Sequence, residues 1–163
     1  EMRKKGMVKE QPFINVSKLA EIPRSYIRKE SIRVDYYYQI SKATKKKEID
    51  IIINNLEIGF GPLPDETKIL TNIALLKILL TNTLIKKVEI YETKVMLHLK
   101  VPNVNFDLIG FLESVQNFNH LNLISYNYEN NKQQGLKISL NYFDVFPSLE
   151  LLFTFISAIR GFI

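Results

Sequence analysis

The residues that could do chemistry in this chain are few and scattered. Its 163 residues include two histidines and no cysteine. Neither His98 nor His120 has a second histidine or a carboxylate at the spacing typical of metal ligands, so both are interpreted as solvated or structural. Without cysteine there is no disulfide and no thiolate metal site. We therefore expect no metal site and no histidine-based catalysis in this chain.

The acidic side chains and the glycines show no catalytic pattern either. Asp and Glu occur singly; Glu57 and Asp65 could form a carboxylate pair, but a solvated face is far more typical of such residues. Residues 59–62, Gly-Phe-Gly-Pro, lack the Lys and the Ser or Thr of a nucleotide phosphate loop. The serines lack the setting of a nucleophile elbow. The sequence thus predicts no catalytic and no cofactor-binding residue.

The first third of the chain is basic and rich in tyrosine, and the formal net charge of the whole chain is +5. The cations are Arg24, Arg28, Lys29, Arg33, Lys42, Lys45, Lys46 and Lys47, and Tyr26, Tyr36, Tyr37 and Tyr38 lie among them. Such interleaving can bind phosphates and stack bases. The alternative, which we favour, is that Tyr36 faces the core and the lysines solvate two helices, because no known nucleic-acid motif is present. Nucleic-acid binding remains the second hypothesis.

Hydrophobic periodicity indicates the elements that hold these residues. Residues 12–16 form a short apolar segment that predicts an edge strand. Apolar residues at a spacing of four predict a helix over residues 28–43. Thr44 is predicted to cap the next helix, which ends at residues 59–61. Pro64 suits the first position of a third helix, whose apolar stripe is so broad that this helix should be the central, most buried one.

The second half of the chain changes to a period of two. Alternation over residues 87–99 and again over 121–140 predicts two antiparallel hairpins, with a helix after each. The whole order predicts an α+β fold, with helices packed on one face of a small antiparallel sheet. We expect a single domain over residues 12–163 after a linker or tail over 1–11. No apolar run approaches the ~20 residues needed to span a bilayer, and no signal peptide is evident.

Several motifs in a fixed order carry a family resemblance. Residues 60–66 read Phe-Gly-Pro-Leu-Pro-Asp-Glu and resemble the Phe-Gly-Pro-Leu-Pro-acid-acid junction in the last domain of bacterial transcription-repair coupling factors. Upstream, residues 22–27 (Ile-Pro-Arg-Ser-Tyr-Ile), 33–37 (Arg-Val-Asp-Tyr-Tyr) and 41–44 (Ser-Lys-Ala-Thr) are similar to the segments around that family's first helix. Downstream, residues 73–77 (Ile-Ala-Leu-Leu-Lys), 86–88 (Lys-Lys-Val) and 107–112 (Asp-Leu-Ile-Gly-Phe-Leu) resemble later segments. The chain is therefore identified as a member of this family over nearly its whole length.

The resemblance implies a non-catalytic regulatory domain of a larger ATP-dependent DNA translocase in transcription-coupled nucleotide excision repair. ATP and Mg²⁺ would bind the motor domains of the parent. Contacts with DNA, RNA polymerase and the excision-repair protein UvrA would lie in other domains. The last domain would fold back onto the UvrA-binding module of the same polypeptide and mask it until polymerase is engaged. It would hold no cofactor itself and would act in the cytoplasm, away from membranes.

The predicted interdomain contact lies around the central motif. Its residues are Asn55, Ile58, Gly59, Phe60, Gly61, Pro62 and Pro64. The family commonly carries acidic and arginine residues just before Phe-Gly, where this chain has Asn55, Ile58 and Gly59. If those acids pair with cations of the masked module, the contact here should be more apolar, weaker or rearranged. A surface Ile58 beside Phe60 would suit an apolar contact; the alternative is that Ile58 belongs to the core.

Overall fold

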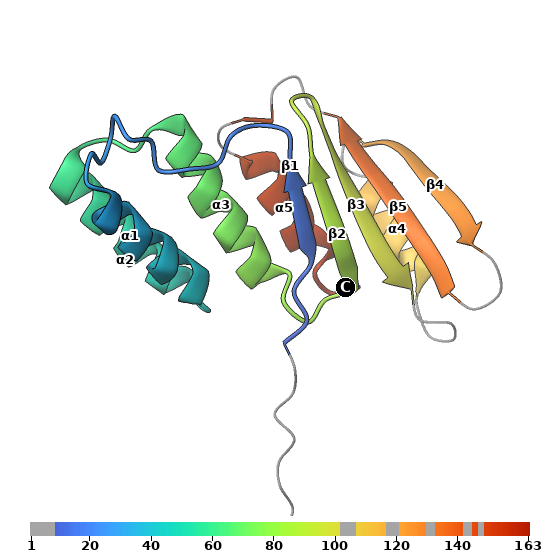
Figure 1. Ribbon diagram of the computed structural model, residues 1–163. Coiled ribbons are helices and arrows are strands. Elements are labelled where there is room, and N and C mark those ends of the chain that lie inside the picture. The colour runs from blue at the N-terminus through green and yellow to red at the C-terminus, as the bar shows by residue number, and fades with distance from the viewer. Residues whose placement is uncertain (1–8, 102–106, 117–120, 130–132, 142–144, 147–148) are drawn as a thin grey trace, which may run out of the picture.

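The computed structural model describes residues 9–101, 107–116, 121–129, 133–141, 145–146 and 149–163 (Figure 1). The elements are β1 (Phe13–Val16), α1 (Glu30–Lys42), α2 (Lys46–Phe60), α3 (Asp65–Leu79), β2 (Ile85–Ile90), β3 (Lys94–Val101), α4 (Leu108–Gln116), β4 (Leu121–Glu129), β5 (Gln133–Asn141) and α5 (Glu150–Ile159). This is the predicted order of strands and helices, so the α+β class is confirmed. None of the helices in these ranges is long and apolar enough to cross a bilayer.

The strands form one five-stranded sheet in the order β1-β2-β3-β5-β4. The two predicted hairpins are present, with β2 antiparallel to β3 and β4 antiparallel to β5. β1 is an edge strand, as predicted, but it runs parallel to β2, so the sheet is mixed and not wholly antiparallel. The reason is that three helices connect β1 to β2 and return the chain to the end of the sheet from which β1 starts.

One face of the sheet is covered by helices. Figure 1 shows α4 and α5 behind the strands, with α3 beside the β1 edge. Alternate residues of the strands point toward these helices, because successive side chains of a strand lie on opposite faces. Fully buried examples are Val88, Val95, Leu97 and Ile138, which share a core with Phe155 of α5. We call β1–β5, α4 and α5 the sheet layer.

A second apolar core lies between the first helices. It contains the buried residues Ile22, Ile27, Ile40, Ile49, Ile52, Leu56 and Leu63. We call residues 17–64 with the α3 face that they cover the helical layer. α3 joins the two layers, since its Leu76 is buried in the sheet core while its Leu75 packs against the helical core. The prediction that this helix is the central one is confirmed, because it needs apolar side chains on two sides.

The ends of α2 differ in detail from the prediction. Lys45 and not Thr44 is the residue that precedes the helix, and the oxygen that satisfies the free amides belongs to Glu48. Its carboxylate accepts the backbone N–H groups of Thr44 (2.6 Å) and Lys45 (3.1 Å), which lowers the pKa of Glu48. A glutamate at this position reaches back to the start of the helix and also carries charge that suits the helix dipole.

Candidate protein-interaction surface

The predicted contact residues gather at the C-terminal end of α2. Asn55, Gly59 and Pro62 are exposed, and Ile58 has 77% of its surface accessible. Ile58 is therefore a surface residue, and the alternative that it belongs to the core is wrong. The reason is its position on the helix, since Ile52 and Leu56 form the buried stripe and Ile58 points away from it.

The same face of α2 continues one helical turn and more toward the N-terminus. Ile51 is 51% exposed and lies seven residues before Ile58, with Asn55 between them. Residues at this spacing share one side of a helix. We call Ile51, Asn55 and Ile58 on this face, together with Phe60 and Pro62 around the end of the helix, the α2 surface; none of them carries a charge. Sequence reasoning missed Ile51, although its spacing from Ile58 and its place outside the buried stripe were visible.

The loop after α2 is fixed by the side chain of Tyr26. The Tyr26 hydroxyl oxygen lies 2.7 Å from the carbonyl oxygen of Gly61 and 3.1 Å from that of Leu56. Gly61 has a φ of 86°, where a residue with a side chain would be strained. Burial, followed by the nearby Glu57 and Tyr36, raises the pKa of Tyr26, so its hydroxyl stays protonated and donates at neutral pH.

Aromatic and backbone contacts complete the anchoring of this loop. The Phe60 ring centroid lies 5.8 Å from that of Tyr26 and 6.3 Å from that of Tyr36, while 37% of Phe60 stays accessible. Leu63 is buried in the helical core. The carbonyl oxygen of Pro64 accepts the N–H of Thr67 (3.0 Å) and so starts α3; Pro64 lies just before the helix and not at its first position. The α2 surface is thus a rigid apolar feature that the fold itself does not cover.

A family model with the description TRCF domain matches residues 17–108. The chain belongs to the TRCF domain family. The fold agrees, since a solved structure described as the C-terminal domain of transcription-repair coupling factor is similar to this chain with a TM-score of 0.70 and 20% sequence identity. The similarity covers 94% of each chain. No curated protein matches.

The two comparisons cover different parts of this TRCF domain. The family match contains the helical layer, β2 and β3, and therefore every residue of the α2 surface. β1, β4, β5, α5 and all but the first residue of α4 lie outside it, and for these elements the solved structure shows similarity of fold alone. The residues predicted as the contact are thus in the part of the chain whose sequence carries the family signal.

Some of the described titratable groups of the TRCF domain form surface ion pairs. A His98 ring nitrogen, Nε2, lies 2.7 Å from a Glu89 carboxylate oxygen, and Lys87 Nζ lies 2.9 Å from the other. Both contacts lower the pKa of Glu89, Lys87 more than His98. Asp65 pairs with Lys68 at 3.0 Å. No group of three or more His, Asp or Glu that could hold a metal occurs in the described part of the chain, and His120 lies outside it.

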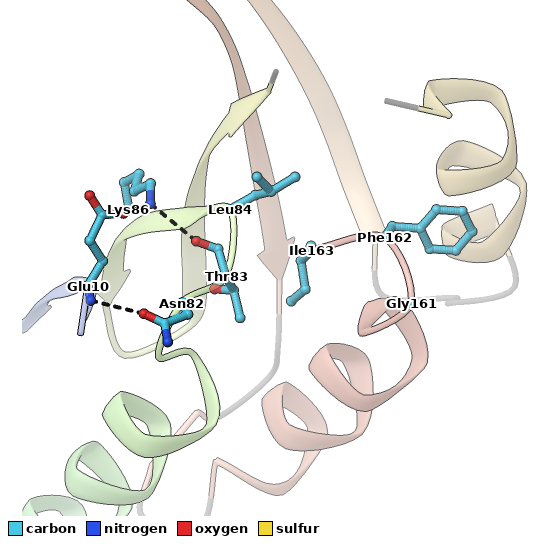
Figure 2. Close-up of a pocket in the computed structure, with 8 residues that line it drawn as sticks. All are labelled: Glu10, Asn82, Thr83, Leu84, Lys86, Gly161, Phe162 and Ile163. Atoms are coloured by element: carbon cyan, nitrogen blue, oxygen red, sulfur yellow. Dashed lines mark hydrogen bonds and ion pairs between the residues drawn. The ribbon is translucent and has the colours of Figure 1, made fainter. Parts of the chain in front are cut away.

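An open hollow lies where β1, β2 and the last residues of the chain meet (Figure 2). Several of its polar groups are paired. The Glu10 N–H donates to the side-chain Oδ1 of Asn82 and the Glu10 carbonyl oxygen accepts the Asn82 N–H, while the Glu10 carboxylate lies 2.6 Å from Lys86 Nζ. Gly161, Phe162 and Ile163 form the other wall. These contacts tie the segment before β1 to the start of β2. They also hold Glu10, within the segment predicted as a linker or tail.

The tyrosines of the basic first third serve the fold more than a ligand. The hydroxyl of Tyr37 accepts the N–H of Ile22 at 2.7 Å, and Tyr26 and Tyr36 hold Phe60. Tyr38 differs, since it is 61% exposed and lies under Lys42. The expectation that Tyr36 faces the helical core is confirmed. Nucleic-acid binding through this segment stays a prediction, and Tyr38 is the tyrosine of this segment whose ring is most exposed for stacking.

Proposed function

We propose that this TRCF domain is a non-catalytic regulatory domain that masks the UvrA-binding module of its own polypeptide. The observation that carries the proposal is the accessible Ile58, which shares one uncovered face of α2 with Ile51 and Asn55. Rigid apolar side chains are the groups that carry most of the binding energy in protein interfaces. ATP, Mg²⁺, DNA, RNA polymerase and UvrA would be bound elsewhere in a cytoplasmic translocase.

The departure from the family pattern fits an apolar form of this contact. Asn55 and Ile58 stand where the family commonly has acids, and both are on the surface. The α2 surface therefore offers no ion pair at these positions. Glu57 and Asp50 lie on one flank of it and are exposed. The complementary patch on the masked module should be apolar at its centre, with polar groups only at the rim.

A weak contact is sufficient for masking within one polypeptide. A short flexible tether gives an effective concentration on the order of 1 mM. With a dissociation constant of about 0.1 mM, which corresponds to about −5.5 kcal/mol, the module would be covered about 90% of the time. A tenfold weaker contact would leave it covered about half of the time. Small changes at the α2 surface should therefore produce a measurable release.

The test is a titration of the ¹⁵N-labelled domain with the separately expressed UvrA-binding module of the same organism, followed by NMR. We expect shifts confined to residues 51–64. Ile58→Asp should weaken binding at least about tenfold, because a charge replaces a buried apolar contact. Ile109→Asp on α4 is the matched control, since Ile109 is 72% exposed and lies in the sheet layer. Equal affinity of the two variants, or no binding at all, contradicts the proposal.

Two further measurements separate masking from simple contact. Tyr26→Phe keeps the α2 surface but removes the hydroxyl that holds the loop, so its affinity should fall less than that of Ile58→Asp. In the full-length parent, both Ile58→Asp and deletion of the domain should strengthen binding of UvrA. If the domain binds the module but its deletion leaves UvrA affinity unchanged, the contact exists without masking.

A further inference from the structure

Among the residues that the structure describes, no helix covers the face of the sheet opposite α4 and α5. No labelled helix lies in front of it in Figure 1. Ile14 and Val16 of β1 pack against the sheet core, so Phe13 and Asn15 point to the open face. In the same way, the buried Val88 and Leu97 place Lys87 and His98 on it.

The strand register places several of these side chains in one row across the sheet. Phe13 pairs with Lys87, Lys87 pairs with His98, and His98 pairs with Lys137. Adjacent strands are about 4.8 Å apart, so this row spans four strands over about 14 Å. Lys100 stands two residues beyond His98 along β3, on the same face.

The charged side chains described on this face are mostly cationic. In β2, β3 and β5 this face carries four lysines and one carboxylate. The lysines are Lys87, Lys94, Lys100 and Lys137, and the carboxylate is that of Glu89. Glu89 is occupied by Lys87 and His98. Lys100 and Lys137 form no ion pair within the described ranges, although the whole chain has 17 acidic residues. Both lysines are therefore without a direct ion pair in the described part of the chain, although Lys86 and, to a smaller extent, Lys100 lower the pKa of Glu10.

Aromatic rings accompany the lysines at two edges of the face. Phe13 is 67% exposed beside Lys87, on the edge strand. The Tyr91 ring lies at the end of β2, with Lys94 Nζ 5.1 Å from its centroid. The exposed phenylalanine offers a ring face on which a base can stack.

From this arrangement we infer that the open sheet face binds single-stranded nucleic acid, with Lys100 and Lys137 on phosphates and Phe13 under a base. A strand with unstacked bases can lie across a sheet and use both kinds of group, whereas a duplex hides its bases from it. An acidic protein would match the lysines but would leave Phe13 without a function. This site is distinct from the α2 surface and from the basic first third.

The probe is a fluorescein-labelled oligothymidylate of about 15 nucleotides, within the length that a comparable surface holds. Anisotropy should show binding with a dissociation constant in the micromolar range at low salt, weakening steeply as salt rises. Lys100→Gln with Lys137→Gln should reduce the slope of log affinity against log salt by about 1.4, since each single-strand phosphate contact contributes about 0.7. Phe13→Ala should weaken binding about tenfold.

Matched controls decide the location. Lys42→Gln with Lys46→Gln removes the same charge from exposed positions of α1 and α2 and should leave the affinity within about twofold. If the helical pair lowers the salt slope as much as the sheet pair, the site is in the first third and the inference is wrong. It is also wrong if no salt-dependent binding occurs, or if poly-glutamate of equal charge competes fully while Phe13→Ala has no effect. Thermal unfolding checks that each variant is folded.

Discussion

The helical layer and the sheet layer bury apolar side chains in similar ways but present opposite surfaces. Large apolar residues that stay exposed are concentrated on α1 and α2: Val34, Tyr38, Ile51, Ile58 and Phe60. The open face of the sheet layer carries lysines instead, with Phe13 at its edge. The difference suggests two kinds of partner for one small domain, a protein at α2 and a polyanion at the sheet.

The two layers also hold their surfaces in place by different means. The open sheet face is ordered by the backbone ladder, so its side chains have a fixed spacing set by strand register. The loop at the end of the α2 surface depends on a side chain that bonds to a carbonyl group distant in the sequence, Tyr26 to Gly61 (2.7 Å). A single substitution can therefore loosen the α2 surface, whereas the sheet face should tolerate most exchanges.

The largest effect tests whether the two layers are one folding unit. Leu56→Ala removes a fully buried side chain of the helical core and should cost about 2–5 kcal/mol. Because α3 belongs to both cores, hydrogen exchange should accelerate in both layers. Leu97→Ala, from the sheet core, is the matched control and should behave alike. Faster exchange confined to α1 and α2 in the first variant would show that the helical layer unfolds by itself.

The dependence of both cores on α3 was predictable from sequence, since its apolar residues extend over so much of the helix. The order of elements and the edge position of β1 were predictable for the same reason, because they follow from periodicity. The parallel direction of β1 was missed. Direction depends on where the chain re-enters the sheet after three helices, and no local pattern records that.

The residues of the candidate site were predictable from the sequence, but the contacts that hold them in place were not. The motif at residues 60–66 drew attention to the end of α2, and Ile58 could be either core or surface on pattern alone. Its exposure depends on which side of α2 meets α1 and α3. The bond from Tyr26 to Gly61 spans 35 residues of sequence, so spacing gives no sign of it. The role of Glu48 at the start of α2 was missed because Thr44 offered an equally good local pattern.

A pair of glycine substitutions sharpens the contrast at the end of α2. Gly61→Ala should cost about 1–3 kcal/mol, because its φ of 86° strains a residue with a side chain. Gly59 lies within α2 and has open space around its Cβ position, so Gly59→Ala should stabilise the domain by about 0.5–1 kcal/mol. Urea unfolding of the two variants measures the difference. Equal effects would mean that the loop does not hold Gly61 in this conformation.

The smallest effect concerns the ion pairs of the open sheet face. The pKa of Glu89 is lowered in the folded protein, so its contribution to stability is present above about pH 4.5 and is lost as the pH falls through the folded value. Glu89→Gln should therefore reduce stability by no more than about 1 kcal/mol at pH 7, since Lys87 is well exposed. As the pH falls below the folded pKa of Glu89, the unfolding temperatures of the two proteins should converge.

The same substitution separates stability from binding. Glu89→Gln releases Lys87 from its partner and adds one unit of positive charge to the open face. Nucleic-acid affinity should therefore rise while stability falls, whereas binding at the α2 surface should not change. Glu57→Gln, on the flank of α2, is the control: it makes the same charge change and should leave oligothymidylate binding close to that of the parent domain. Weaker oligothymidylate binding by Glu89→Gln would show that Glu89 holds Lys87 in a binding position instead of neutralising it. The charge of the open sheet face alone would then not explain its affinity for a polyanion.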